Sequence, residues 1–480
     1  MTDAPNVPPG NRGPKQSIPL SEGDVNFSPR RREWQKSEID KETAYWLNED
    51  ARYFLHQSLS TPCLNVLDSA HGSCIQDLQG RQFLDFHGNS VHQVGFRNEA
   101  VIEAVTEQLA TLPFCSRRYT NIPAIKLARR LAALAPGRLN RSLFVPGGAE
   151  AVGIALKLAR LATGRFKTIS LWDSFHGASI ETISIGGEAL FRHGIGPLLP
   201  GSEHVPPPTP HKCLFGCEGI CRLRCADYID YVMEKEGDIA AVIAEPIRST
   251  VVTMPPPGYW QRVREICDRH GALLIFDEIP VCLGRTGRMF ACEAIGVTPD
   301  ILVIGKGLGG GVIPMAAVIA RDDLNVGADV ALGHYTHEKS PLGAAAAIAT
   351  LDFIEQEGLP ERASAMGSYM LDRLLAMQKR YAIIGDVRGL GLLIGIELVN
   401  LTGEPANDEA DHVMYAALRA GLSFKVSGGN VITLTPPLTV SRSEVDEALA
   451  ILEKCITEIS PIRVTSTHAE ARNGSKVNGL

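Results

Sequence analysis

Along the middle of the chain, short apolar runs alternate with longer segments in which apolar residues recur at helical spacing. Four runs are almost continuous in apolar residues, as strands buried on both faces of a sheet are; they cover residues 167–172, 239–244, 272–276 and 301–304. This alternation predicts an α/β fold with a mostly parallel sheet that helices cover on both sides. Ligands of such sheets bind at the carboxyl ends of the strands.

The same pattern divides the chain into a large domain and a smaller one. We predict a large domain over residues 96–354 and a smaller α+β domain built from residues 45–95 and 355–462, in which the early strands join the C-terminal sheet. Residues 1–44 are rich in Pro, Gly, Asn and charged residues and are predicted to form a flexible arm, while residues 463–480 are predicted to be a disordered tail.

A single lysine follows the last of the four runs. Lys306 lies in residues 305–311, of which five are glycines. A solvated lysine is protonated at neutral pH, whereas a desolvated one near other charges can lose its proton and form a Schiff base. The run at 272–276 ends in Asp277 and Glu278, which point to opposite faces of their strand, and we assign Asp277 to the ligand side. A lysine that forms an imine, with a carboxylate that keeps a pyridine nitrogen protonated, is what pyridoxal phosphate requires.

Other candidate contacts of this cofactor also follow predicted strands. Residues 144–151 end a strand and open a helix with two glycines, so the free amides there are candidates for binding a phosphate dianion. Phe175 follows the strand at 167–172 and is a candidate for lying on the pyridine ring, with His176 beside it. Glu245 ends the strand at 239–244 and is predicted to face the same crevice.

Composition limits the possible partners. The chain has 480 residues and a formal net charge of −7, so neither nucleic acid nor a membrane surface is a predicted partner. No apolar run approaches the roughly 18 residues that a spanning helix needs, and the first residues do not resemble a secretion signal. We therefore expect a cytoplasmic protein. Its 11 cysteines are odd in number and mostly scattered along the chain, which fits reduced thiols better than a framework of disulfides.

Four of the cysteines recur at every fourth residue. They are Cys213, Cys217, Cys221 and Cys225. Four thiolates can bind zinc or an iron–sulfur cluster, but such sites usually pair their cysteines and separate the pairs by a longer loop. The even spacing favours reduced thiols or one apolar stripe along a helix, so we predict that these cysteines bind no metal. A structural metal site is the alternative interpretation.

These segments resemble the class III aminotransferase family of pyridoxal-phosphate enzymes over about residues 45–460. The most specific matches lie at residues 277–287 and 299–311. The resemblance implies fold type I, the aspartate aminotransferase-like fold, and a homodimer. It also implies that Lys306 forms the Schiff base and moves protons, and that Asp277 pairs with the pyridine nitrogen. The other contacts that it implies are Gly148 and Ala149 at the phosphate, Phe175 on the ring and, from the neighbouring subunit, Thr336 at the phosphate.

Two departures from the family pattern bear on the reaction. Pro280 stands where the family usually has a glutamine that touches the phenolic oxygen of the cofactor. Thr433 stands where the family usually has an arginine that clamps the substrate α-carboxylate. A transaminase needs that clamp to bind its keto acid, whereas an enzyme that eliminates a group from a single amine does not.

Further sequence segments around the predicted site resemble one branch of the family, the (R)-1-hydroxy-2-aminoethylphosphonate ammonia-lyases. The matching segments are residues 85–89, 112–121, 173–179 and 333–341. The resemblance implies a carbon–nitrogen lyase of phosphonate catabolism that releases phosphonoacetaldehyde and ammonia. Its anionic substrate needs basic partners, for which Arg117, Arg118 and Lys425 are candidates. The alternatives are an ω-amino acid:keto acid aminotransferase and a phospho-lyase acting on an amino-alcohol phosphate.

Overall fold

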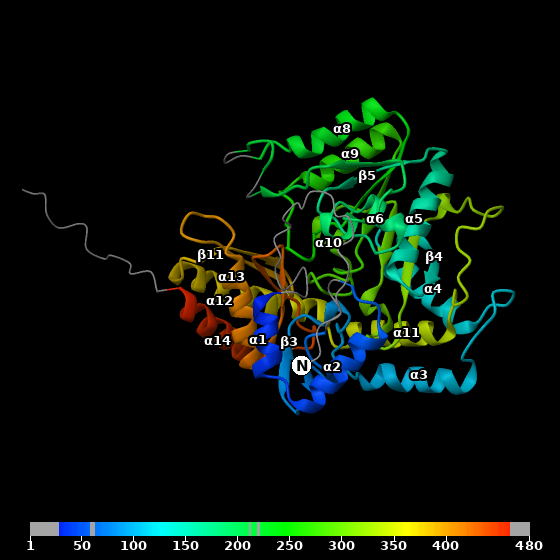
Figure 1. Cartoon of the computed structure of the whole chain (residues 1–480). Coiled ribbons are helices and arrows are strands. Elements are labelled where there is room, and N and C mark those ends of the chain that lie inside the picture. The colour runs from blue at the N-terminus through cyan, green and yellow to red at the C-terminus, as the bar shows by residue number, and fades with distance from the viewer. Residues whose placement is uncertain (1–27, 58–62, 211–212, 218–220, 461–480) are drawn as a thin grey trace, which may run out of the picture.

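The structure, a computed structural model, describes residues 28–57, 63–210, 213–217 and 221–460. In Figure 1 the C-terminal part of the chain, drawn in orange and red, lies beside the first helix, drawn in blue. The cyan and green elements of the large sheet and its helices form the other side of the molecule. Among the described residues, no helix combines the length and the apolar character that crossing a bilayer requires.

The large sheet has seven strands in the order β4–β10–β9–β8–β7–β5–β6. Their bounds are β4 Leu139–Val145, β5 Lys167–Leu171, β6 Ser202–Val205, β7 Ile239–Ala244, β8 Leu273–Asp277, β9 Ile301–Ile304 and β10 Ala316–Arg321. Strand β10 is antiparallel to both of its neighbours, and the pairs from β9 to β6 are parallel. The four predicted strands are therefore confirmed as β5, β7, β8 and β9, and so is the mostly parallel sheet.

Helices cover both faces of this sheet. Ile275 of β8 packs with the residues of α5 (Gly148–Thr163) on one face, whereas Phe276 packs edge-on against Trp260 of α9 (Tyr259–His270) on the other. The other helices of this part are α3 Glu99–Thr111, α4 Ile122–Leu134, α6 Ile180–Ile185, α7 Ala189–Arg192, α8 Arg224–Glu236, α10 Ala291–Ile295 and α11 Pro341–Gln356. Because side chains alternate along a strand, Asp277 shares the α5 face with Ile275.

The remaining strands form two four-stranded sheets, ordered β1–β2–β3–β13 and β11–β12–β15–β14. The bounds are β1 Leu67–His71, β2 Cys74–Asp77, β3 Gln82–Asp85, β11 Ile384–Leu390, β12 Leu393–Leu398, β13 Leu422–Ser423, β14 Lys425–Ser427 and β15 Val431–Leu434, with the helices α12 Leu359–Arg380, α13 Asn407–Arg419 and α14 Arg442–Ile459. Strand β13 runs parallel to β3, with Leu422 opposite Leu84. The early strands thus pair with one strand from the C-terminal segment, but they do not join the sheet of β11, β12, β15 and β14, so the prediction of one shared sheet is wrong.

The described part of the predicted N-terminal arm is helical and packed. Helices α1 (Pro29–Ser37) and α2 (Lys41–Tyr53) begin at Ser28 and Asp40, whose side chains accept from the amides of Arg31 and Thr43. Trp34 is fully buried, and its ring lies 6.0 Å from that of Tyr415 on α13. The prediction of a flexible arm up to residue 44 is therefore wrong from residue 28 onward, because one buried tryptophan outweighs the polar composition around it. Residues 1–27 and the predicted tail 463–480 lie outside the described residues.

Candidate functional site

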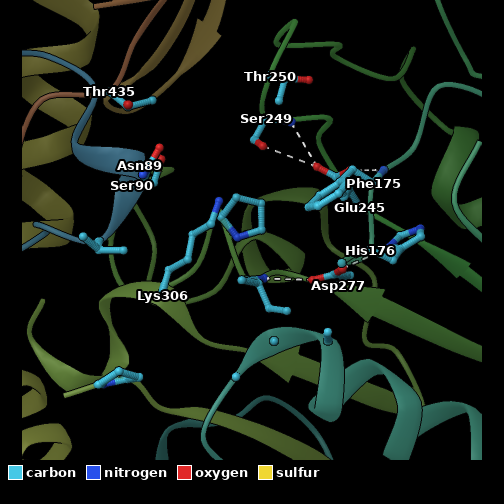
Figure 2. Close-up of a pocket in the computed structure, with 18 of the residues that line it drawn as sticks. Asn89, Ser90, Phe175, His176, Glu245, Ser249, Thr250, Asp277, Lys306 and Thr435 are labelled. Atoms are coloured by element: carbon cyan, nitrogen blue, oxygen red, sulfur yellow. Dashed lines mark hydrogen bonds and ion pairs between the residues drawn. The ribbon is translucent and has the colours of Figure 1, made fainter. Parts of the chain in front are cut away.

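A cavity of about 560 Å³ opens at the carboxyl ends of the central strands (Figure 2). Residues at the end of β4, β5, β7, β8 and β9, or shortly after it, all line this cavity: Gly148 and Ala149, Phe175 and His176, Glu245, Asp277, and Lys306. The structure therefore brings together within one chain most of the cofactor contacts that the sequence predicts. Loops at the ends of neighbouring parallel strands meet at one edge of a sheet, which explains the convergence.

Asp277 lies at the floor of this cavity and is fixed by two hydrogen bonds. Its Oδ2 lies 2.8 Å from Nδ1 of His176, and its Oδ1 accepts from the amide of Ile279 at 3.2 Å. A carboxylate only accepts, so His176 carries its proton on Nδ1. The carboxylate can then hold a proton on a ring nitrogen of a ligand above it.

Glu278 points the other way. Its two oxygens accept from the amides of Ala291 and Cys292 at 2.6 and 2.7 Å, at the start of α10. Burial raises the pKa of Glu278 to about 7. This glutamate anchors a short helix and does not line the cavity.

Lys306 stands on a tightly packed turn, the 3₁₀ segment η3 (Lys306–Gly309). Its φ of +47° lies in the left-handed region, which is uncommon for a residue other than glycine. A Cβ on the next residue, Gly307, would lie 1.8 Å from Oε1 of Gln93, so a larger residue there would have to displace the buried Gln93 side chain. The turn therefore holds the lysine in one place, where its side chain extends into the cavity (Figure 2).

The surroundings of Lys306 favour its neutral form. Burial within the protein lowers the pKa of this amine, although Glu245 and Asp277 act in the opposite direction. The charges of Lys425 and Arg248 lower the pKa further. The side chain remains accessible from the cavity, so the amine can act as a nucleophile and as a base toward a ligand there.

The start of α5 forms a cradle for an anion. Its N-cap, Gly147, has no side chain to occupy the free amides of the first turn. A Cβ at Gly147 would lie 2.5 Å from Oε2 of Glu150, and one at Gly148 would lie 2.7 Å from Cδ1 of Ile279. Little space is left for side chains beside these two glycines, and Gly148 and Ala149 line the cavity at the first turn of α5, where phosphates bind to free amides of a helix. With Asp277, Phe175 and Lys306, this donor set fits pyridoxal phosphate.

Glu245 holds the wall of the cavity together. Its Oε1 accepts from the amide of Phe175 at 3.2 Å, and its Oε2 accepts from the amide of Ser249 at 3.2 Å. Arg248 pairs with Glu245 and, through Nη2, with Glu188 at 2.5 Å. Burial opposes ionisation of Glu245, but the guanidinium of Arg248 and the two amides leave its pKa below the usual value. Sequence reasoning missed Arg248 and Glu188, although Arg248 follows the predicted strand end closely.

A lysine stands opposite the threonine that replaces the expected arginine. Lys425 of β14 pairs in register with Thr433 of β15, and both residues line the cavity. Directly opposite residues of an antiparallel pair have Cβ atoms roughly 5 Å apart. The cavity thus has a positive charge one strand away from the place where the family has its clamp.

The other predicted site residues lie outside this cavity. Arg117 and Arg118 are exposed, and Arg117 contacts His334 and, at 3.9 Å, Glu338. Thr336 is exposed as well. Within one chain the structure does not bring these three residues to the cofactor contacts, so their roles stay predictions.

The regularly spaced cysteines do not form a helical stripe. Cys213, Cys217 and Cys221 lie in the connection between β6 and α8, and only Cys225 lies on the helix. Within the described ranges, no group of three or more His, Cys, Asp or Glu residues is arranged to hold a metal ion. The helical-stripe interpretation is therefore wrong for three of the four cysteines.

Comparison with known proteins extends these observations. The family model for class-III aminotransferases matches residues 56–456. The chain is 50% identical over 456 residues, 92% of its length and 95% of the relative's, to a Vibrio splendidus protein named (R)-1-hydroxy-2-aminoethylphosphonate ammonia-lyase. A Bacillus anthracis aminotransferase structure matches with a TM-score of 0.80 and 31% identity over 88% of this chain and all, 100%, of that one. An amine transaminase from an uncultivated Pseudomonas species, solved with pyridoxal phosphate bound, matches with a TM-score of 0.78 and 32% identity, over 85% of this chain and 98% of its own.

These likenesses confirm the predicted fold type I architecture and the predicted cofactor, pyridoxal phosphate. They extend over nearly the whole chain, from the early strands to α14. This chain belongs to the class-III aminotransferase family of pyridoxal-phosphate enzymes.

Proposed function

We propose that this enzyme is a carbon–nitrogen lyase that converts (R)-1-hydroxy-2-aminoethylphosphonate to phosphonoacetaldehyde and ammonia. The observation that carries the proposal is the cross-strand pair Lys425 and Thr433, which gives the cavity a lysine and leaves the expected clamp position uncharged. A phosphonate is a compact anion that an ammonium group can neutralise. The 50% identity to the Vibrio splendidus lyase supports the same substrate.

Each cavity residue has a separate role toward the cofactor in this proposal. When bound, pyridoxal phosphate supplies an aldehyde that captures amines and a ring that withdraws electrons. Asp277 holds a proton on the ring nitrogen, and His176 keeps the carboxylate in position. The amides of Gly148 and Ala149 bind the phosphate, and Phe175, whose backbone Glu245 holds, lies against the ring.

Lys306 carries the proton in the proposed reaction. Its neutral amine removes a proton from the amine-bearing carbon of the substrate and delivers it to the hydroxyl that leaves the neighbouring carbon, so the carbon–oxygen bond breaks and water departs. Hydrolysis of the released enamine consumes one water and gives phosphonoacetaldehyde and ammonia. No keto acid takes part, so the reaction has no use for the missing arginine.

Two further parts of the proposal concern the protein as a whole. We infer a homodimer in which Thr336 of one chain reaches the phosphate bound by the other, which agrees with its exposed position away from its own cavity. Arg117 and Arg118 stay candidates for the phosphonate. A cytoplasmic location and a part in phosphonate catabolism are proposed on the same basis as the substrate.

The proposed reaction is tested by incubating the purified enzyme with (R)-1-hydroxy-2-aminoethylphosphonate and no keto acid. We expect ammonia and aldehyde to accumulate over many turnovers, because elimination returns the cofactor unchanged. An aminotransferase would stop after one turnover per site, and a phospho-lyase would release inorganic phosphate from an amino-alcohol phosphate. Either result would replace the proposed function with one of those alternatives.

Changing Lys425 to methionine is expected to weaken substrate binding more than it slows the chemistry. A charge-assisted hydrogen bond contributes about 1.5–3 kcal/mol, so kcat/KM should fall roughly 10- to 100-fold, mainly through KM. The matched control is Lys379→Met, which removes an exposed lysine from α12. Steady-state kinetics with an unchanged KM in Lys425→Met would exclude Lys425 as the phosphonate partner.

A further inference from the structure

A short left-handed turn lies at the cavity, shortly after the end of β3. Gly88, Asn89 and Ser90 form the segment η1, and their φ values are 46°, 47° and 56°. The left-handed region costs L-residues energy, and runs of it are rare. A Cβ on Gly88 would lie 2.4 Å from the ring of His92, so close packing requires glycine at that position. Asn89 and Ser90 adopt the same unfavourable conformation without being glycine.

The surrounding structure holds the turn in this conformation. The hydroxyl of Thr435 donates to the carbonyl of His87 at 3.0 Å, and the amide of Thr435 donates to the carbonyl of Phe86 at 2.7 Å. Below the turn, Nε2 of His92 lies 3.1 Å from the carbonyl oxygen of Asp85. Strained backbone that is fixed from several sides is a feature of functional sites.

The turn presents polar side chains to the cavity. His87, Asn89 and Ser90 all line it, and Figure 2 shows Asn89 and Ser90 on the opposite side of the Lys306 amine from Glu245 and Asp277. Phe175, His176, Glu245 and Asp277 thus lie on one side of the Lys306 amine, and Asn89 and Ser90 of the turn lie on the other. A substrate whose amine the cofactor has captured would reach the turn with its adjacent carbon if that carbon extends past Lys306, away from the residues assigned to the cofactor.

The surroundings of His87 favour a neutral imidazole. Burial and the positive charges of Lys425 and Lys306 lower the pKa of His87 to about 3, although the Asn89 side chain acts in the opposite direction. A neutral imidazole offers one donor and one acceptor, which matches a hydroxyl group in either tautomer. It does not match a phosphonate, which needs donors only. Among the described cavity residues near both lysines, His87 is therefore suited to an uncharged polar group of the substrate.

We propose that His87, supported by Asn89, binds the hydroxyl that leaves from the substrate and so selects amines that carry a hydroxyl on the adjacent carbon. The inference rests on the proposed function, because that function supplies the hydroxyl. Lys425 takes the phosphonate and His87 the hydroxyl, so the two groups on one carbon are held apart. The carbon–oxygen bond is thereby oriented for elimination, while His87 neither gains nor loses a proton.

The test compares two reactions of the same holoenzyme in His87→Phe. Ammonia release from (R)-1-hydroxy-2-aminoethylphosphonate should fall about 100-fold in kcat/KM, because the site loses its partner for the hydroxyl. Exchange of the carbon-bound hydrogen of 2-aminoethylphosphonate in deuterated water should be unchanged, because that molecule has no hydroxyl. The preference for the (R) over the (S) enantiomer should fall, and His87→Gln should restore part of the ammonia release. His71→Phe, which changes an exposed histidine of β1, is the matched control.

A second variant separates binding from folding. Asn89→Gly removes the side-chain amide and places glycine, which tolerates left-handed backbone best, at this position. The melting temperature should therefore not fall, whereas the rate of ammonia release should fall. Equal loss of exchange and of ammonia release in His87→Phe would overturn the inference, as would full ammonia release. Wild-type enzyme that releases no ammonia from the hydroxylated substrate would instead refute the proposed function, and the inference with it.

Discussion

Lys306→Ala is expected to lower ammonia release by roughly 10⁴-fold or more, because in the proposed reaction one side chain both holds the cofactor and moves the proton. Lys425 also lines the cavity, but it stands on β14 of another sheet and not just past the end of β9, where Lys306 stands. Borohydride treatment followed by denaturation should leave the cofactor attached to wild-type protein and not to the variant. Turnover is measured as ammonia formed per site.

The control for this substitution is Lys454→Ala, which removes an exposed lysine from α14. Added ethylamine should restore part of the proton transfer in Lys306→Ala, since a small amine can occupy the space of the deleted side chain. Turnover that survives at wild-type rates would show that another group performs the chemistry.

Asp277→Asn is the second large effect that we expect. The change keeps the size of the side chain but removes the charge that, in the proposed reaction, would hold a proton on the ring nitrogen, so kcat should fall roughly 10²- to 10³-fold. His176 would keep a hydrogen-bond partner, because the amide oxygen of asparagine can accept from Nδ1 at the place where the carboxylate accepts now. Single-turnover absorbance measurements separate the slower chemistry from any change in cofactor binding.

Glu278→Gln provides a matched control on the next residue. It converts a carboxyl group to an amide on a side chain that points to α10 and not to the cavity. We expect it to affect the free energy of unfolding, while kcat per folded enzyme stays near the wild-type value. Loss of kcat in Glu278→Gln and not in Asp277→Asn would reverse the assignment of the two carboxylates.

The sequence was sufficient for the parts of the site that depend on strand ends. Asp277 could be separated from Glu278 because side chains alternate along a strand, and β8 is regular up to that point. Lys306 and residues 144–151 could be found because a glycine cluster follows an apolar run in each case. The strand–helix alternation predicted the large sheet, since parallel strands buried on both faces leave a plain apolar signature.

Other features depend on contacts between distant segments and left no such signature. The position of Lys425 opposite Thr433 follows from the register of β14 and β15, which a sequence pattern does not specify. The left-handed conformation of Asn89 and Ser90 depends on His92 and Thr435, which pack around it. Helix α1 was missed because its composition is polar, although Trp34 packs against Tyr415 of α13 and Arg419 of α13 pairs with Glu38 at the end of α1.

The hydrogen bond from Thr435 to His87 joins residues that are 348 positions apart in the chain. A ribosome must therefore synthesise nearly the whole polypeptide before the turn at Gly88 has the partner that braces it. Contacts of such long separation slow folding and leave strand edges unpaired in the meantime. The nascent enzyme is thus expected to need chaperone protection until its last strands emerge, and truncation before β15 should yield aggregates and not a partly active protein.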